Sequence, residues 1–267
     1  MQRLAFISDT RIAAGGTEPA PAWERAAERV AWLQPAATVH LGPITRDGAD
    51  RPASVQLAAD LLKAWPTPVH SLPGAQDLGG NARGPAPGAL MRFRRQIGAD
   101  RWAVPLGRWL LVGMNTRLFG SGSECEAEQW DWLDRLAAAD TRRNLLLCLT
   151  LPLPRTPLEG LSEPDAHLSP EVSERLLGGV FGRRLAAVCA AGLSEAQAHH
   201  GFRVDRLAAG DGLRAIDQLV IGDPSRGLGW MTLDDSAVEL GYVILDRSPA
   251  GPAEPVLRRD DVTVCAA

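Results

Sequence analysis

The chain has 267 residues, of which 45% are apolar and 22% are charged, a balance usual for globular proteins. Its formal net charge is −4 and its pI is near 5.8, which excludes the strongly basic face typical of nucleic-acid-binding proteins. The four cysteines are far apart and form no C-x-x-C pair, so neither a zinc knuckle nor a disulfide framework is indicated.

The first 72 residues alternate between short apolar runs and helical repeats. Strands are predicted at 2–8, 37–41 and 68–72, and helices over 23–33 and 55–65. The chain enters its first strand without the basic and apolar regions of a signal peptide, and no apolar run reaches membrane-spanning length. We therefore expect a cytoplasmic protein that contacts neither membrane nor nucleic acid. The β-α-β-α-β order indicates parallel strands joined by crossover helices.

The middle of the chain continues this pattern after a loop, rich in Gly, Pro and Ala, at 74–90. Ser123 and Glu126 form a capping-box sequence before a helix that contains Trp130, Leu133 and Leu136. Further buried strands are predicted at 108–115, 144–150 and 185–191.

After residue 200 the pattern changes to short alternating strands joined by Gly and Asp turns. No linker rich in Gly and Ser separates this part from the rest. We therefore expect one domain over 1–267, with an α/β part at about 2–200 and a mainly β part at about 201–267 that completes the second sheet.

Five segments in order carry a resemblance to a known family: "FISDTRI", "VHLGPITRDG", "VHSLPGAQDL", "LLLCLTLPLP" and "AAVCAAGLSE". Two more segments fit it, "LLVGMNTRLFGSG…EAEQWDWLDRL" and "ELGYVILD". Over roughly residues 2–245 the chain resembles the calcineurin-like metallophosphoesterase superfamily. The resemblance implies an α/β fold, a four-layer α-β-β-α sandwich. It also implies a site at the strand ends, where two metal ions activate water and bind phosphoryl oxygens.

The sequence departs from the family pattern at nearly every metal ligand. Asp9 is kept, but Arg11 stands where the family has a histidine, and Pro43 replaces the aspartate that bridges the metals. Ala75 and Gln76 replace the Asn-His pair of the third segment. The fourth segment has no histidine near residues 150–151, and the fifth reads Gly-Leu-Ser-Glu, ending at Glu195, in place of Gly-His-x-His. The sequence therefore predicts a degenerate member with no metal ion and no cofactor.

A shifted alignment of the sequence with the family pattern does not place histidines at the metal-ligand positions. His40 and His70 precede their segments inside strand patterns, where satisfied core or edge positions are expected. His199 and His200 follow the fifth segment and could approach the site, although a solvated loop is the simpler interpretation.

Arg11 introduces a permanent cation where a metal ion is expected. We hypothesise that its guanidinium takes the place of a metal and pairs with Asp9, and with Asp77 or Glu195. The alternative is that Arg11 points to solvent.

Three functions remain open. The first is a pseudoenzyme that binds a partner protein, self-associates or stabilises an assembly. The second is a repurposed metal-independent enzyme with Asp9, Arg11, Asp77 and Glu195 as candidate catalytic groups. The third is a module that binds a small anion, with the candidate ligand-binding residues Arg11, Arg46, Gln76 and His199.

Overall fold

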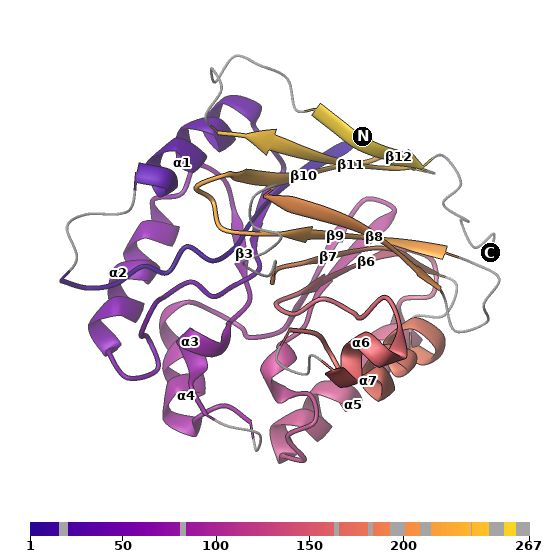
Figure 1. The fold of residues 1–267 in the computed structure, drawn as a ribbon, viewed down its shortest axis with the longest axis horizontal. Helices are drawn as coiled ribbons and strands as arrows, with labels where there is room; N and C mark the ends of the chain where they lie inside the picture. Colours follow the sequence, from indigo (N-terminus) through magenta and orange to yellow (C-terminus); the bar gives the residue numbers. More distant parts are fainter. Residues whose placement is uncertain are drawn as a thin grey trace.

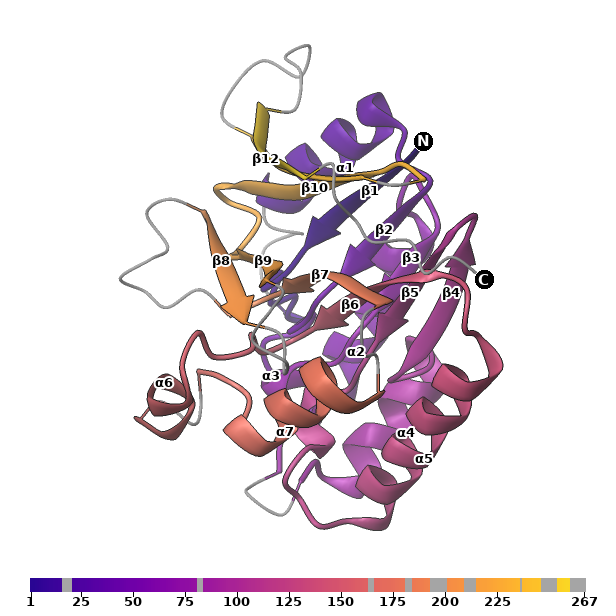
Figure 2. The ribbon, with the colours of Figure 1, turned by 90° about the vertical axis from the view of Figure 1, so that its right-hand side faces the viewer.

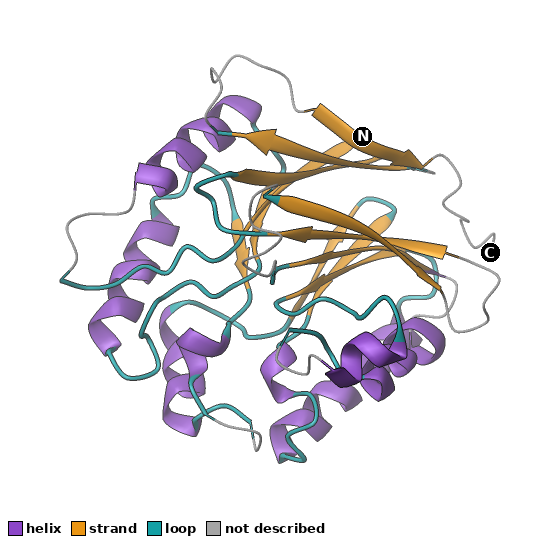
Figure 3. Ribbon diagram, in the orientation of Figure 1, coloured by secondary structure: helices purple, strands orange, loops and turns teal. Residues whose placement is uncertain are grey.

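The fold is a four-layer sandwich in which two six-stranded sheets face each other and helices cover their outer faces (Figures 1 and 3). The computed structural model describes residues 1–267 apart from 16–20, 81–83, 163–165, 181–183, 193–200, 209–214, 236, 246–253 and 260–267. The α-β-β-α architecture expected from the sequence is confirmed.

The first sheet has the strand order β12-β11-β10-β1-β2-β3. Its parallel part is β1 (Gln2–Ile7), β2 (Ala37–His40) and β3 (Val69–Ser71), connected by α1 (Pro21–Leu33) and α2 (Pro52–Lys63). These strands and helices lie where the apolar patterns predict them. Its antiparallel part is β10 (Gly227–Leu233), β11 (Val238–Ile244) and β12 (Glu254–Arg259).

The second sheet has the order β4-β5-β6-β7-β9-β8. It contains β4 (Trp102–Leu106), β5 (Trp109–Gly113), β6 (Asn144–Leu149), β7 (Leu185–Ala190), β8 (Phe202–Ala208) and β9 (Ala215–Ile221). From the sequence we expect residues of about 201–267 to complete the second sheet. In the structure β8 and β9 lie in this sheet, whereas β10–β12 extend the first sheet.

Three apolar clusters hold the layers together. One lies between the two sheets and includes Phe6, Trp109 and Cys148. A second packs the outer face of the second sheet against α5 (Glu124–Ala139) and α7 (Pro170–Glu174), and the third packs α1, α2 and α4 (Pro87–Gln96) on the first sheet. The turned view of Figure 2 shows α4, α5 and α7 on the outer side of the sheets.

The structure corrects the expected loop at 74–90. That stretch contains α3 (Ala75–Leu78) and the start of α4, in which Ala89, Leu90 and Phe93 are buried at helical spacing. The Gly and Pro residues around this short apolar repeat hide it in the sequence. Proline at the start of a helix is favourable because its missing N–H has no partner to lose there.

The sequence patterns did not predict several other short elements. They are the edge strand β4, a 3-10 turn at Thr116–Leu118, α6 (Pro157–Ser162), α7 and a π-helical segment at Arg175–Val180. The Ser123 cap is present, since its Oγ accepts the Glu126 N–H at 3.3 Å. The Glu126 carboxylate, however, accepts the N–H groups of Gly120 and Gly122, so the expected reciprocal capping box is wrong.

Candidate functional site

The loops that follow β1 and β2 run side by side at the C-terminal ends of the strands. Asp9 N–H donates to the Gly42 carbonyl at 3.1 Å, and Ile12 N–H donates to the Ile44 carbonyl at 2.8 Å. Asp9 and Arg11 both have left-handed backbones, with φ of 52° and 47°. Such values are uncommon for residues other than glycine, so the tertiary contacts of this loop decide where the two side chains lie.

Asp9 and Arg11 form an ion pair, with Arg11 Nη2 and Asp9 Oδ1 3.3 Å apart. The Arg11 side chain is 56% exposed and that of Asp9 is 16% exposed. Burial raises the pKa of Asp9, and the nearby Arg11 guanidinium opposes this shift. Arg11 therefore reaches both its expected partner and solvent.

Asp77 does not join this pair, because its carboxylate is fully used elsewhere. Oδ2 accepts the N–H groups of Ile44 (2.9 Å) and Gly74 (2.8 Å), and Oδ1 accepts the N–H (2.7 Å) and hydroxyl (2.6 Å) of Thr45. All four contacts are donors, so they suit an ionised carboxylate. Burial raises the pKa of Asp77 against these hydrogen bonds. Asp77 thus ties the loop after β2 to the loop after β3.

His40 is fully buried and has a partner on each ring nitrogen. Gly42 N–H donates to Nδ1 at 3.0 Å, which places the proton on Nε2, and Nε2 donates to Thr10 Oγ1 at 2.8 Å. Burial lowers the pKa of His40 to about 3, so the ring is neutral at physiological pH. The second histidine, His70, is half-buried against the Trp102 ring at the outer edge of β3.

Pro43, which replaces the bridging aspartate, is packed against the loop after β3. A Cβ built on Gly74 would lie 2.6 Å from Pro43 Cα, and one built on Gly42 would lie 2.7 Å from the Leu72 carbonyl oxygen. Glycine is needed at both places because the two loops approach closely. Thr150 Oγ1 donates to the Pro73 carbonyl at 3.2 Å and joins the second sheet to the same loops.

Two other candidate residues, Arg46 and Gln76, make no described polar contact with the Asp9–Arg11 pair. The hydrogen bonds and ion pairs of the described residues connect neither Arg46, which is exposed, nor Gln76, which is half-buried, to either side chain. Glu195, His199 and His200 lie outside the described residues.

The described residues at these strand ends do not fit a pair of divalent metal ions. Metal ligation needs free carboxylate oxygens or imidazole nitrogens, whereas Asp77 and His40 use theirs on protein donors and acceptors and Asp9 pairs with a cation. Among the residues that the structure describes, no three His, Cys, Asp or Glu side chains are grouped so that they could hold a metal.

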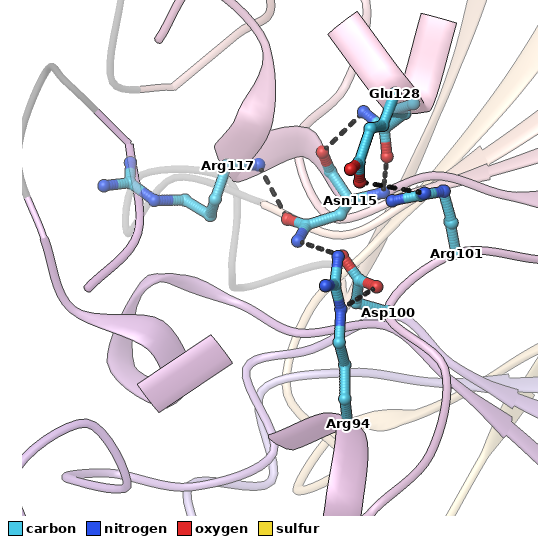
Figure 4. Close-up of polar contacts among 7 residues, drawn as sticks. Arg94, Asp100, Arg101, Asn115, Arg117 and Glu128 are labelled. Atoms are coloured by element: carbon cyan, nitrogen blue, oxygen red, sulfur yellow. Dashed lines mark hydrogen bonds and ion pairs between the residues drawn. The ribbon is translucent and has the colours of Figure 1, made fainter. Parts of the chain in front are cut away.

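A second polar cluster, which the sequence patterns did not reveal, lies beyond α4 (Figure 4). The buried Asp100 carboxylate accepts Arg94 Nε at 2.7 Å and Asn115 Nδ2 at 2.9 Å. Gln129 exchanges two hydrogen bonds of 3.1 Å with the Asn115 backbone. The cluster holds α4, β5 and α5 together and presents its charged groups to one another, which indicates a structural role. No sequence pattern signals this cluster, because Arg94 and Asp100 are six residues apart and helical neighbours are three or four apart.

No protein-family model matches the sequence, and no curated protein matches it. Solved structures do match. A dimetal phosphatase from Danio rerio is 15% identical with a TM-score of 0.58, covering 91% of this chain and 96% of that one. A purple acid phosphatase from yellow lupin is 12% identical with a TM-score of 0.64, covering 95% of this chain, which spans 52% of the lupin enzyme.

GAP50 of Plasmodium, described as the anchor in the inner membrane complex, is 10% identical with a TM-score of 0.58, covering 97% of this chain and 88% of that one. At these identities the likeness concerns the fold. In the described residues no helix has both the length and the apolar character needed to span a membrane. The chain therefore has the calcineurin-like metallophosphoesterase fold.

Proposed function

We propose that this chain is a non-catalytic protein of the metallophosphoesterase fold that acts by binding another protein chain. The observation that carries the proposal is the state of Asp9 and Asp77. Arg11 pairs with the first, and four donors from the loops after β2 and β3 bind the second. Asp9 is the carboxylate that the sequence keeps from the metal-ligand pattern, and Asp77 is a second carboxylate at the same strand ends. Here both bind groups of the protein itself and stabilise the loops.

The partner-binding role is supported by the fold and by the surface. GAP50, which has this fold, is described as an anchor. On α1 the Trp32 side chain is 51% exposed, and the guanidinium of the buried Arg29 lies 5.0 Å from its ring centroid. Trp is among the residue types that contribute most at protein interfaces, so we assign the outer face of α1 around Trp32 as the candidate contact surface. The partner is another protein or a second copy of this chain.

The absence of metal chemistry is tested by elemental analysis and by phosphodiester hydrolysis. The purified protein, grown with added manganese, iron and zinc, is expected to hold well under one ion per chain and to leave bis-p-nitrophenyl phosphate intact. One or two ions per chain together with metal-dependent hydrolysis would contradict the proposal.

The partner role is tested by cross-linking and mass measurement of the native complex. Trp32→Ala is expected to remove the partner, and Arg11→Ala, at the strand ends, to retain it. Equal partner recovery from both variants would exclude the α1 surface.

One observation favours a second function, a metal-independent enzyme or an anion-binding module at the strand ends. Arg11 is accessible beside a carboxyl group whose pKa is raised by burial, and such a pair can bind an anion or transfer a proton. Under this alternative Arg11→Ala abolishes function, whereas the partner-binding role is unaffected by it.

A further inference from the structure

A cavity lies at the opposite end of the second sheet from Thr150. It has a volume of about 650 Å³ and is lined by the β4–β5 turn and the α5–β6 connection, namely Gly107, Arg108, Ala139, Asp140, Thr141, Arg142 and Arg143. Since β5 and β6 are parallel and begin just after these segments, the cavity is at the N-terminal ends of the strands. Its size lies within the range of small-molecule sites.

Arg143 holds the two walls of the cavity together. Its Nε donates to the Gly107 carbonyl at 3.1 Å, and its Nη1 donates to Asp140 Oδ2 at 2.5 Å. Asp140 Oδ1 also accepts the N–H groups of Arg142 and Arg143, at 3.3 and 3.2 Å. Although burial opposes it, the hydrogen bonds from Arg143 hold the pKa of Asp140 below its usual value.

The other negative features at this end also have partners. The C-terminus of a helix carries a partial negative charge on its last carbonyls. Arg184 donates to two of these oxygens, on Ala137 and Asp140, and its Nη1 lies 3.9 Å from Asp140 Oδ1. The acceptors beside the cavity are therefore already neutralised by cations of the protein.

The guanidinium groups of Arg108 and Arg142 are two further cations that pair with none of these described acceptors. Both are exposed, and in the described part of the chain neither guanidinium takes part in a hydrogen bond or an ion pair. The cavity thus has three arginines and one aspartate in its lining, in a chain whose net charge is −4. Planar guanidinium groups bind phosphate oxygens through paired N–H donors.

We propose that this cavity binds a small molecule bearing a phosphate or diphosphate group, through Arg108 and Arg142, with Arg143 fixing the walls. The site is separate from the strand ends that bear Asp9 and Arg11, and it does not depend on the partner-binding proposal. It adds a ligand site at an end of the fold where the sequence patterns indicated none.

The test is a calorimetric titration of the full chain with inorganic pyrophosphate at constant ionic strength. The variant Arg108→Ala/Arg142→Ala removes the proposed contacts. The matched control Arg25→Ala/Arg135→Ala removes two exposed arginines on α1 and α5 that are outside the cavity lining. Saturable binding is expected in the wild type and in the control, weakened at least tenfold in the cavity variant.

Three results would overturn the proposal. They are no saturable binding to the wild type, equal weakening in the control, and loss of binding in Arg11→Ala with the cavity variant unaffected. The last result would place the anion at the strand ends and favour the alternative function given above. Because the guanidinium groups of Arg108 and Arg142 make no described hydrogen bond or ion pair, urea unfolding of the cavity variant is expected to match that of the wild type.

Discussion

The two ends of the sandwich differ in how their charged side chains are used. At the strand ends, Asp77 accepts four hydrogen bonds and Asp9 pairs with Arg11, so the carboxylates serve the protein itself. At the opposite end Asp140 is likewise paired, but the guanidinium groups of Arg108 and Arg142 have no described partner, and both residues line a cavity. Both ends carry charged side chains, but at the cavity end two guanidinium groups without a described partner belong to residues that line one cavity. This difference is why we propose a ligand site at the cavity and a structural role for Asp77.

The largest effect is expected at Asp77, because it joins two loops from a buried position. In Asp77→Asn an amide N–H₂ faces donors, so at least two hydrogen bonds to a charged group are lost. We expect the free energy of unfolding to fall by about 3 kcal/mol in urea unfolding. Asp60→Asn, at an exposed position on α2, is the control and should change it by less than about 0.5 kcal/mol. Similar losses in both variants would mean that the strand ends are not held by Asp77.

The second effect is a pH dependence at His40. Its folded pKa of about 3 is below the unfolded value of 6.5, so the unfolded state takes up the proton first as the pH falls. The stabilisation is complete above pH 6.5 and is lost progressively toward pH 3. Urea unfolding at pH 7.5 and at pH 5 measures this effect. Between these two pH values the free energy of unfolding of the wild type should fall by about 2 kcal/mol more than that of His40→Gln, because glutamine does not titrate.

Burial also lowers the pKa of His70, so His70 adds its own pH dependence to the stability of both proteins. The effect of His40 is therefore the difference between the pH profiles of the wild type and His40→Gln. Identical pH profiles for the two proteins would show that the His40 ring is accessible to protons in the folded state.

A smaller effect is expected for the arginine that joins the cavity walls. Arg143→Ala loses the contacts to Gly107 and Asp140, and because the side chain is partly exposed we expect a loss of about 1 kcal/mol. Arg142→Ala, one residue earlier and without a described side-chain contact, should leave the unfolding midpoint unchanged. Equal losses would indicate that both arginines are structural, which would weaken the comparison between the two ends.

The smallest effect is expected for Arg11→Ala. The Asp9–Arg11 pair is largely exposed on the arginine side, so its removal should cost less than about 0.5 kcal/mol. The same change should raise the pKa of Asp9 further, since the guanidinium that lowers this pKa is lost, as an NMR titration of the Asp9 carboxyl would show. A fall in that pKa would mean that Arg11 does not face Asp9 in solution.

Much of the fold could be predicted from the sequence because its strands are short apolar runs in a fixed order. The strands at 2–7, 37–40 and 144–149 are buried throughout or nearly so, and such runs are recognisable without long-range information. α4 and β4 were missed, because their patterns are short and lie among Gly and Pro residues.

The site was predictable only in part. The loss of the metal-ligand pattern is visible in the residues themselves, and Arg11 beside Asp9 in the sequence suggested the ion pair. That Asp77 would bind Ile44, Thr45 and Gly74 instead of Arg11 depends on how closely the loops after β2 and β3 approach.

The amino-acid sequence by itself determined the order of strands and helices, the resemblance to the metallophosphoesterase fold and the replacement of its metal ligands, because each depends on residue type and local spacing. Only the tertiary structure decided which sheet the last strands join, which carboxylate each donor binds, and that Arg108 and Arg142, 34 positions apart, line one cavity. Such contacts depend on distances between segments far apart in the chain, which residue patterns do not specify.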